Sequence, residues 1–322
     1  MSDAMANSGV LITGAAGFIG SALLRALAAG GDGPVTALDL REVQPQQRLD
    51  GIAYEHGDIR DPGLKDVIAR VKPRTVVHLA SVVAVGGDDR RDYEIDVLGT
   101  RNVLEACLAA GVDHLIVTSS GAAYGYHADN PVPLRETDPL RGNEDFPYAR
   151  NKREVEEMLA RWRQDHPQLR QTVFRPCTVL GPTTNNQITA LFERPVVTGL
   201  SGTATPFSLI ADSDVVAALA QAVRTGKGGI YNLAGDGTLS LREIARLNGK
   251  PFVPIPPAMM KGALWLLHAL GLTKLTPQNV KFIQYRPVLD NTRLKSEFGY
   301  SPKLGARAVF ERYRDERPEP MS

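Results

Sequence analysis

Three glycines spaced three residues apart follow the first apolar run of the chain, and they restrict its fold more than any other feature. Residues 10–13 are followed by Gly14, Gly17 and Gly20, and then by helix-favouring residues 21–27. This pattern predicts a strand, a tight turn and a helix. A backbone that approaches a pyrophosphate closely leaves no room for a Cβ, and the helix start offers free N–H groups at the positive end of its dipole. We therefore expect a phosphate-binding turn; the alternative is an ordinary helix cap.

An acidic residue ends the second apolar run. Asp39 lies 19 residues after Gly20, where a dinucleotide site places the carboxylate that binds the adenosine ribose. The negative charge favours NAD, because a 2′-phosphate would be repelled, although Arg41 leaves NADP open as the weaker candidate. The alternative for Asp39 is a solvated strand end.

Composition bounds the class of protein. With 322 residues and 43% hydrophobic content, the chain suffices for one large domain or a domain with an added lobe. Its net charge of +1 provides no broad field for nucleic acid or anionic lipid, so we expect neither a nucleic-acid nor a membrane partner. Cys107 and Cys177 are predicted to be buried free thiols, and residues 1–8 have no secretory pattern, which together favour the cytoplasm.

The longest apolar helical stretch, residues 258–270, is interrupted by Lys261 and His268. It is shorter than the roughly 20 residues that span a bilayer. We expect a helix that lies in the core or lines a pocket, and a membrane-touching face is the alternative.

Apolar runs and helical patterns alternate along the first half of the chain. Strands are expected near 52–61, 75–81 and 115–120, and helices near 64–71 and 93–111. The alternation predicts a doubly wound parallel sheet, with Asp58 facing the crevice where an adenine would lie. Small residues at 80–87 would let a cofactor lie close to the backbone.

A second chemical motif follows the fifth strand, which ends in Ser120. Tyr148 and Lys152 lie four residues apart at the head of a predicted helix, so their side chains share one face. A neighbouring cation favours the phenolate form of a tyrosine, whose free pKa near 10 makes it a poor base at neutral pH. The pair is a candidate proton-transfer site, although such pairs also occur on ordinary helix surfaces. No metal site is expected.

With these motifs the chain resembles the extended short-chain dehydrogenase/reductase superfamily and, within it, the NAD-dependent epimerase/dehydratase family. The matching segments are residues 13–20, 57–61, 78–81, 99–106, 118–120, 148–152 and 175–182. The resemblance implies a Rossmann-type doubly wound parallel sheet with a smaller C-terminal substrate-binding lobe. It implies that Tyr148 is the general acid/base, that Lys152 lowers its pKa and binds the nicotinamide ribose, and that Ser120 hydrogen-bonds the reacting oxygen.

The resemblance also implies the cofactor contacts and the domain boundaries. The NAD-binding domain would cover residues 8–182, with returns at about 206–235 and 290–312, and the substrate lobe would cover 183–205 and 236–289. Helices near 93–110 and 147–163 resemble those that pair in family homodimers, or else they simply cover the sheet. The implied cofactor-binding residues are Gly14, Gly17, Phe18, Ile19, Gly20, Asp39, Asp58, Ile59, Leu79, Ala80, Tyr148, Lys152 and Pro176.

Departures from the family pattern bear on the reaction. Dehydratases carry an Asp-Glu pair after the fifth-strand hydroxyl, where this chain has Gly121 and Ala122, so dehydration is not expected. Epimerases usually have an arginine for the nucleotide pyrophosphate near Thr205, and here only Arg194 or Arg286 is left to supply that cation. Two smaller departures are Thr178 and Asp96, where asparagine is usual.

We therefore favour an NAD-dependent oxidoreductase that transfers hydride between a small-molecule secondary alcohol or carbonyl and the nicotinamide. The alternative is a sugar-nucleotide 4-epimerase similar to UDP-glucose 4-epimerase, with tightly bound NAD and no net redox change. A second alternative is a non-catalytic NAD-binding sensor or scaffold.

Overall fold

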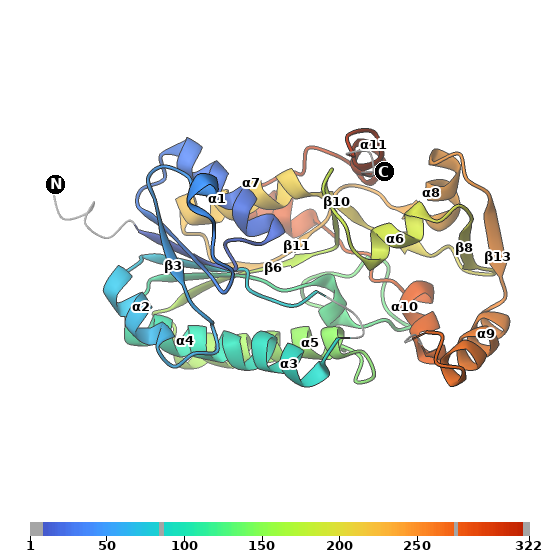
Figure 1. Ribbon diagram of the computed structural model, residues 1–322, viewed down its shortest axis with the longest axis horizontal. Helices are drawn as coiled ribbons and strands as arrows, with labels where there is room; N and C mark the ends of the chain where they lie inside the picture. The colour runs from blue at the N-terminus through green and yellow to red at the C-terminus, as the bar shows by residue number, and fades with distance from the viewer. Residues whose placement is uncertain (1–8, 84–86, 274–275, 318–322) are drawn as a thin grey trace.

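A seven-stranded parallel sheet forms the centre of the computed structural model, which describes residues 9–83, 87–273 and 276–317 (Figure 1). The strand order is β11-β6-β5-β4-β1-β2-β3, so the chain starts in the middle and winds outward in both directions. This confirms the Rossmann-type doubly wound sheet. The strands are β1 (Val10–Thr13), β2 (Val35–Asp39), β3 (Ile52–His56), β4 (Thr75–His78), β5 (His114–Thr118), β6 (Arg170–Pro176) and β11 (Gly229–Leu233).

Helices cover both faces of this sheet, which is why most residues of its central strands are buried (Figure 1). On one face α1 (Phe18–Gly30) packs against α7 (Asp212–Thr225). The other face carries α2 (Leu64–Val71), α4 (Thr100–Ala109) and α5 (Pro147–Asp165). Alternate residues of β1 divide between the two layers, since Ile12 packs with the α1 layer and Leu11 with the α4 layer.

The helix expected near 93–111 extends further toward the N-terminus than predicted. It runs through α3 (Asp89–Tyr93), a π-type turn η2 (Glu94–Gly99) and α4. On the two helices that resemble the pairing helices of family homodimers, Leu104, Val155 and Leu159 are buried against the sheet. These side chains therefore cover the sheet, and the homodimer stays a prediction.

A second group of elements extends from the carboxyl edge of the sheet and includes most of the predicted lobe (Figure 1). A separate apolar core, which includes Phe192, Phe207 and Phe310, holds much of it together. Its strands pair as β8 with β13, β9 with β12, and β7 with β10. The elements are β7 (Thr178–Leu180), α6 (Gln187–Glu193), β8 (Val197–Leu200), β9 (Pro206–Phe207), β10 (Leu209–Ala211), β12 (Leu239–Ser240), α8 (Leu241–Leu247), β13 (Phe252–Ile255), α9 (Pro257–Ala269), α10 (Val280–Gln284) and α11 (Ala306–Asp315).

The expectation that the apolar helix at 258–270 lies in the core is wrong, and its alternative of lining a pocket stays a prediction. The helix forms as α9, but none of its residues is buried. The residues of such a stretch favour a helix, but they do not determine which face of the helix packs against another element. Within the described residues, no helix combines the length and apolarity needed to cross a membrane.

Candidate active site

The glycine turn between β1 and α1 has the close backbone packing that its sequence predicts. Gly14 adopts a φ of +71°, and a Cβ there would lie 2.6 Å from the backbone nitrogen of Ala80. At Gly20 a Cβ would lie 2.2 Å from the carbonyl oxygen of Gly14. Gly17 is the N-cap residue of α1, and it has no side chain that could cap the helix. The first N–H groups of this 13-residue helix are therefore free to bind an anion. The turn therefore fits the pyrophosphate of a dinucleotide.

Asp39 lies directly beside this turn, at the end of β2. One carboxylate oxygen accepts a hydrogen bond from the Ala16 N–H at 2.9 Å, and the other accepts one from the Arg41 N–H at 2.8 Å. Asp39, Arg41 and His56 also line a cavity of about 240 Å³. The carboxylate is thus placed at the predicted ribose end of the dinucleotide site, with Arg41 next to it.

The structure distributes the other predicted cofactor residues along the same edge of the sheet. Phe18 is exposed at the first position of α1, and Ile19 follows it, half-buried. Leu79 and Ala80 come directly after β4, and Pro176 ends β6. These backbone segments all lie at the carboxyl ends of parallel strands, where doubly wound folds bind their ligands.

The side chains of Asp58 and Ile59, two predicted cofactor-binding residues, lie in different surroundings. Asp58 accepts hydrogen bonds from the Arg60 guanidinium, the shortest at 2.6 Å, which lowers the pKa of its carboxyl group. The Ile59 side chain is buried in the core, where its Cδ1 would lie 2.6 Å from a Cβ at Gly99. Asn102 donates hydrogen bonds to the carbonyl oxygens of Ile59 at 2.7 Å and Asp61 at 2.8 Å, and so fixes this loop.

The three predicted catalytic residues come together at the head of α5. The Lys152 ammonium lies 5.7 Å from the ring centre of Tyr148 and donates a hydrogen bond to Ser81 Oγ at 2.8 Å. Ser120 Oγ accepts a hydrogen bond from the Ala122 N–H at 3.1 Å. Burial raises the pKa of Tyr148 to about 12, against a lowering contribution from its hydrogen bond with Ser120. Ser81 is a functional neighbour that sequence reasoning did not identify, although it ends a matching segment.

Asp96 is a buried carboxylate close to this site. It lies on η2, and its Oδ1 accepts a hydrogen bond from the Val82 N–H at 3.0 Å. Its Oδ2 is buried and has no hydrogen-bond partner among the described residues. The negative charge of Asp96 contributes to the raised pKa of Tyr148. The carboxylate at position 96, where asparagine is usual, therefore raises the pKa of the proposed acid/base.

A neutral histidine links the strand ends to η2. Thr100 Oγ1 donates its proton to the Asp96 carbonyl oxygen at 2.5 Å, so it accepts from His78 Nε2–H at 3.0 Å. His78 Nδ1 is then left to accept from Thr13 Oγ1 at 2.7 Å. Burial lowers the pKa of His78 to about 3, with a smaller contribution from the charge of Lys152. This chain of bonds holds β1, β4 and η2 in fixed relation beneath the cofactor turn.

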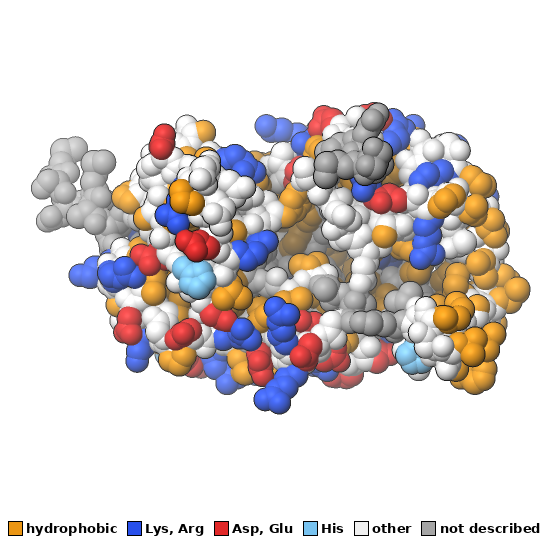
Figure 2. Space-filling view, in the orientation of Figure 1, with side chains coloured by type: hydrophobic (Ala, Val, Ile, Leu, Met, Phe, Trp, Pro, Cys, Tyr) orange, Lys and Arg blue, Asp and Glu red, His pale blue; other side chains and the backbone are white. Residues whose placement is uncertain are grey.

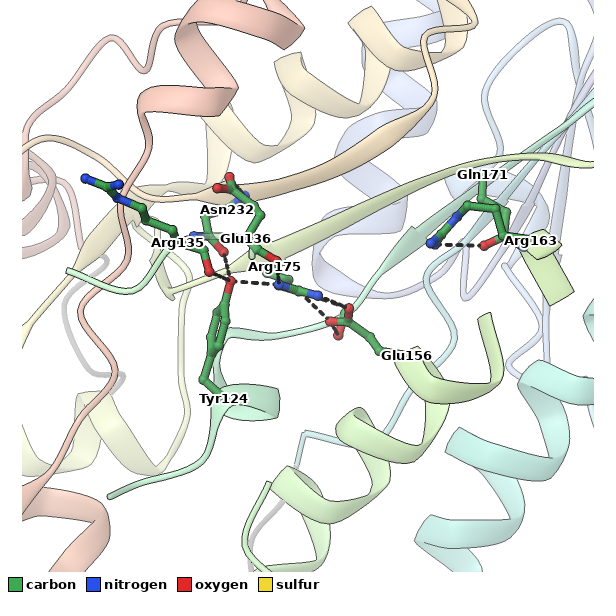
Figure 3. Close-up of polar contacts among 9 residues, drawn as sticks. Tyr124, Arg135, Glu136, Glu156, Arg163, Gln171, Arg175 and Asn232 are labelled. Atoms are coloured by element: carbon green, nitrogen blue, oxygen red, sulfur yellow. Dashed lines mark hydrogen bonds and ion pairs between the residues drawn. The ribbon is translucent and has the colours of Figure 1, made fainter. Parts of the chain in front are cut away.

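A buried ion pair joins α5 to the central sheet (Figure 3). Arg175 on β6 donates to both carboxylate oxygens of Glu156 on α5, the shortest bond being 2.6 Å. Ser119 also donates to Glu156 at 2.6 Å, and Arg175 donates to Tyr124 Oη at 2.7 Å. Tyr124 in turn lies 2.8 Å from the Asn232 side chain on β11. The network joins the β5 end to α5, β6 and β11, so it positions the Ser120 and Tyr148 backbones.

Arg286 supplies a positive charge on the lobe side of the site. Its guanidinium lies 4.1 Å from the ring centre of Phe207 and donates to Thr178 Oγ1 at 3.0 Å. Among the described residues no carboxylate forms an ion pair with it. Arg194, the other candidate, is exposed at the end of α6. The structure therefore favours Arg286 over Arg194 as the cation for a substrate anion.

An aromatic cluster connects the lobe with the head of α5. Phe282 on α10 stacks on Phe146 with ring centres 4.1 Å apart, and Tyr126 contacts both rings edge-on. The Phe146 and Tyr148 ring centres are 6.2 Å apart. Since Arg286 follows α10 closely in the chain, these contacts hold the cation and the acid/base in one region.

The chain is similar to proteins of one family and to several named epimerases. The pattern of the NAD-dependent epimerase/dehydratase family matches residues 10–234. UDP-glucose 4-epimerase of Mycolicibacterium smegmatis is 28% identical over 313 residues, which cover 91% of this chain and 93% of that protein. N-acetyl-alpha-D-glucosaminyl-diphospho-ditrans,octacis-undecaprenol 4-epimerase of Escherichia coli O157:H7 is 30% identical over 196 residues, covering 58% and 54%.

A solved structure agrees in fold and in cofactor. The Thermus thermophilus UDP-glucose 4-epimerase in complex with NAD has a TM-score of 0.74 and 26% identity, covering 95% of this chain and 99% of that one. The glycine turn and Asp39 of this chain fit the same cofactor, so NAD binding is supported by fold, geometry and relatives together. The chain belongs to the NAD-dependent epimerase/dehydratase family.

Proposed function

We propose that this protein is an NAD-dependent 4-epimerase of a sugar that is carried on a diphosphate. The observation that carries the proposal is Arg286, a guanidinium without a carboxylate partner in the described chain, next to Thr178. The preference for a net dehydrogenase in the sequence analysis depended on the lack of a pyrophosphate cation. Arg286 removes that reason, and the family relatives that are named 4-epimerases support the alternative.

The residues at the head of α5 would move one proton. Ser120 and Tyr148 would hold the C4 hydroxyl of the sugar, and the Tyr148 phenolate would take its proton. The Lys152 ammonium, 5.7 Å from the ring centre of Tyr148, would favour that phenolate by its charge. Burial raises the pKa of Tyr148 and so has the opposite effect. NAD, when bound, accepts hydride from the sugar carbon and returns it. Tyr148 would then give the proton back once the opposite face of the sugar has been presented.

A product assay tests this proposal. Purified protein would be incubated with NAD and UDP-glucose, with a farnesyl-diphosphate-linked sugar, and with plain secondary alcohols. We expect the C4 epimer of a diphosphate-linked sugar and no accumulation of NADH. Net NADH formation with a plain alcohol, and no epimer from any diphosphate-linked sugar, would instead establish a dehydrogenase.

A further inference from the structure

Helix α9 and the residues after it present apolar side chains to solvent. Met259, Trp265 and Leu270 are 66%, 65% and 62% exposed, and Leu272 is 71% exposed. Of the thirteen exposed large hydrophobic side chains in the described chain, six lie within residues 259–272. Figure 2 shows orange side chains gathered at this end of the lobe. Such a concentration marks an interaction surface.

The helix is apolar on the face that contacts the lobe and also on its outer face. Its half-buried residues, Pro257, Met260 and Leu264, are spaced three and four apart and form the face that contacts the lobe. The apolar residues Met259, Ala263, Leu266 and Leu270 follow one another at intervals of four, three and four on the outer face, and all are exposed. A surface helix normally turns its apolar stripe inward. The outer face of α9 therefore lacks an apolar partner within the described chain.

The charge around this helix indicates what the partner is. Residues 244–289 contain no Asp or Glu and six Lys or Arg, whereas the whole chain has a net charge of +1. Lys281 in this segment forms an ion pair with Asp145, but Lys261 on α9 is exposed, four residues from Trp265. A helix with exposed apolar and tryptophan side chains, in a stretch of the chain that contains no acidic residue, fits the interface of an anionic bilayer.

Helix α9 packs against the element that joins the lobe to the candidate active site. Helix α9 contacts α10, whose Phe282 stacks on Phe146 at the head of α5. Arg286 follows α10 and provides the cation for a diphosphate. A bilayer seated on α9 would thus lie against the same part of the lobe that holds the substrate cation.

We propose that the outer face of α9 binds the surface of an anionic lipid bilayer, and that the substrate diphosphate carries a polyprenyl chain held in the same bilayer. The second part rests on the proposed function. Met259, Leu266 and Leu270 insert among the acyl chains. This proposal differs from the expectation of no membrane partner, which rests on the net charge of the whole chain.

Flotation of the full chain with vesicles tests the docking surface. We expect it to float with mixed phosphatidylcholine and phosphatidylglycerol vesicles, and less with phosphatidylcholine alone. The double variant L266E/L270E should lose about tenfold or more in partitioning, because each buried leucine contributes strongly to insertion. Val132→Glu is the matched control, since Val132 is 74% exposed on a different loop. In a Trp162→Phe background, Trp265 emission should shift to the blue when vesicles are added.

Bound NAD content confirms that each variant is folded, and epimerisation of the water-soluble farnesyl-diphosphate-linked sugar is measured in the same samples. Equal flotation of the wild type and the double variant, or no flotation of the wild type, would overturn the docking proposal. Self-association that the double variant abolishes, without flotation, would also overturn it and assign the face to a second copy. Flotation without epimerisation of any diphosphate-linked sugar would leave docking supported and overturn the proposed function instead.

Discussion

At the scale of single residues, the charge environment of Tyr148 decides how the site moves a proton. Burial holds the pKa of this phenol at about 12, and the buried Asp96 carboxylate contributes to the raised value. A base that abstracts a proton must be deprotonated, so the rate rises with pH toward the pKa of Tyr148. The charges that raise or lower this pKa therefore set the working pH range.

Asp96→Asn should shift the rising limb of the pH–rate profile to lower pH. The asparagine Oδ1 can still accept from Val82, while the negative charge that raises the pKa of Tyr148 is removed. The measurement is kcat against pH at saturating substrate. Asp89→Asn removes the same charge from an exposed position on α3 and is the control. A shift toward higher pH, or equal shifts in both variants, would contradict the coupling.

Arg286→Ala should raise KM for the diphosphate-linked sugar about ten- to hundredfold, because a charged hydrogen bond to the diphosphate is lost. Its effect on NAD content should be small, since Arg286 lies on the lobe side of the site. Arg194→Ala is the matched control, because it also removes an arginine, but from the exposed end of α6. Equal KM values for the two variants would remove Arg286 from the substrate site.

At the scale of elements, the Arg175–Glu156 pair is the main polar connection between α5 and the sheet. Glu156→Gln should lower the free energy of unfolding by about 3 kcal/mol, because it leaves a buried guanidinium charge uncompensated. Urea denaturation measures this value. Glu144→Gln breaks an ion pair of Arg153 in which Glu144 is 72% exposed, and should cost less than about 0.5 kcal/mol. A small loss in Glu156→Gln would mean that the network does not stabilise α5.

The elements also show what the sequence could and could not predict. The turn at Gly14, Gly17 and Gly20 was predicted because strand, turn and helix are encoded within one local stretch. The contact of Arg286 with Thr178 spans 108 residues, so no local pattern could assign it. Helix α9 was predicted as a helix, but its exposed apolar face was not, because periodicity does not reveal which face meets a partner.

At the scale of the whole molecule, the parallel sheet places all the chemistry at one edge. The glycine turn, Asp39, Ser120 and Pro176 come from different strands, and their convergence follows from the strand order β6-β5-β4-β1-β2. The lobe then brings Arg286 and Phe282 to the same edge. The fold class was predictable from alternating strands and helices. The reaction depends on residues of the sheet and of the lobe that are far apart in the sequence.

Tyr148→Phe separates cofactor binding from chemistry in the assembled molecule. We expect turnover to fall about a thousandfold or more, since the general base is lost, while bound NAD stays near the wild-type amount. Turnover by the product assay and NAD content by absorbance after denaturation are measured on the same sample. Parallel loss of both would contradict the acid/base assignment.

In the proposed 4-epimerase reaction, hydride leaves a sugar carbon and returns to the same carbon. The most direct measurement uses UDP-glucose, or the farnesyl-diphosphate-linked sugar, with deuterium at C4, and analyses the product by mass spectrometry and NMR. We predict that the epimer retains the deuterium at C4 and that none accumulates in free NADH. Deuterium found in NADH, with a keto sugar as the product, would contradict the account and establish a net dehydrogenase.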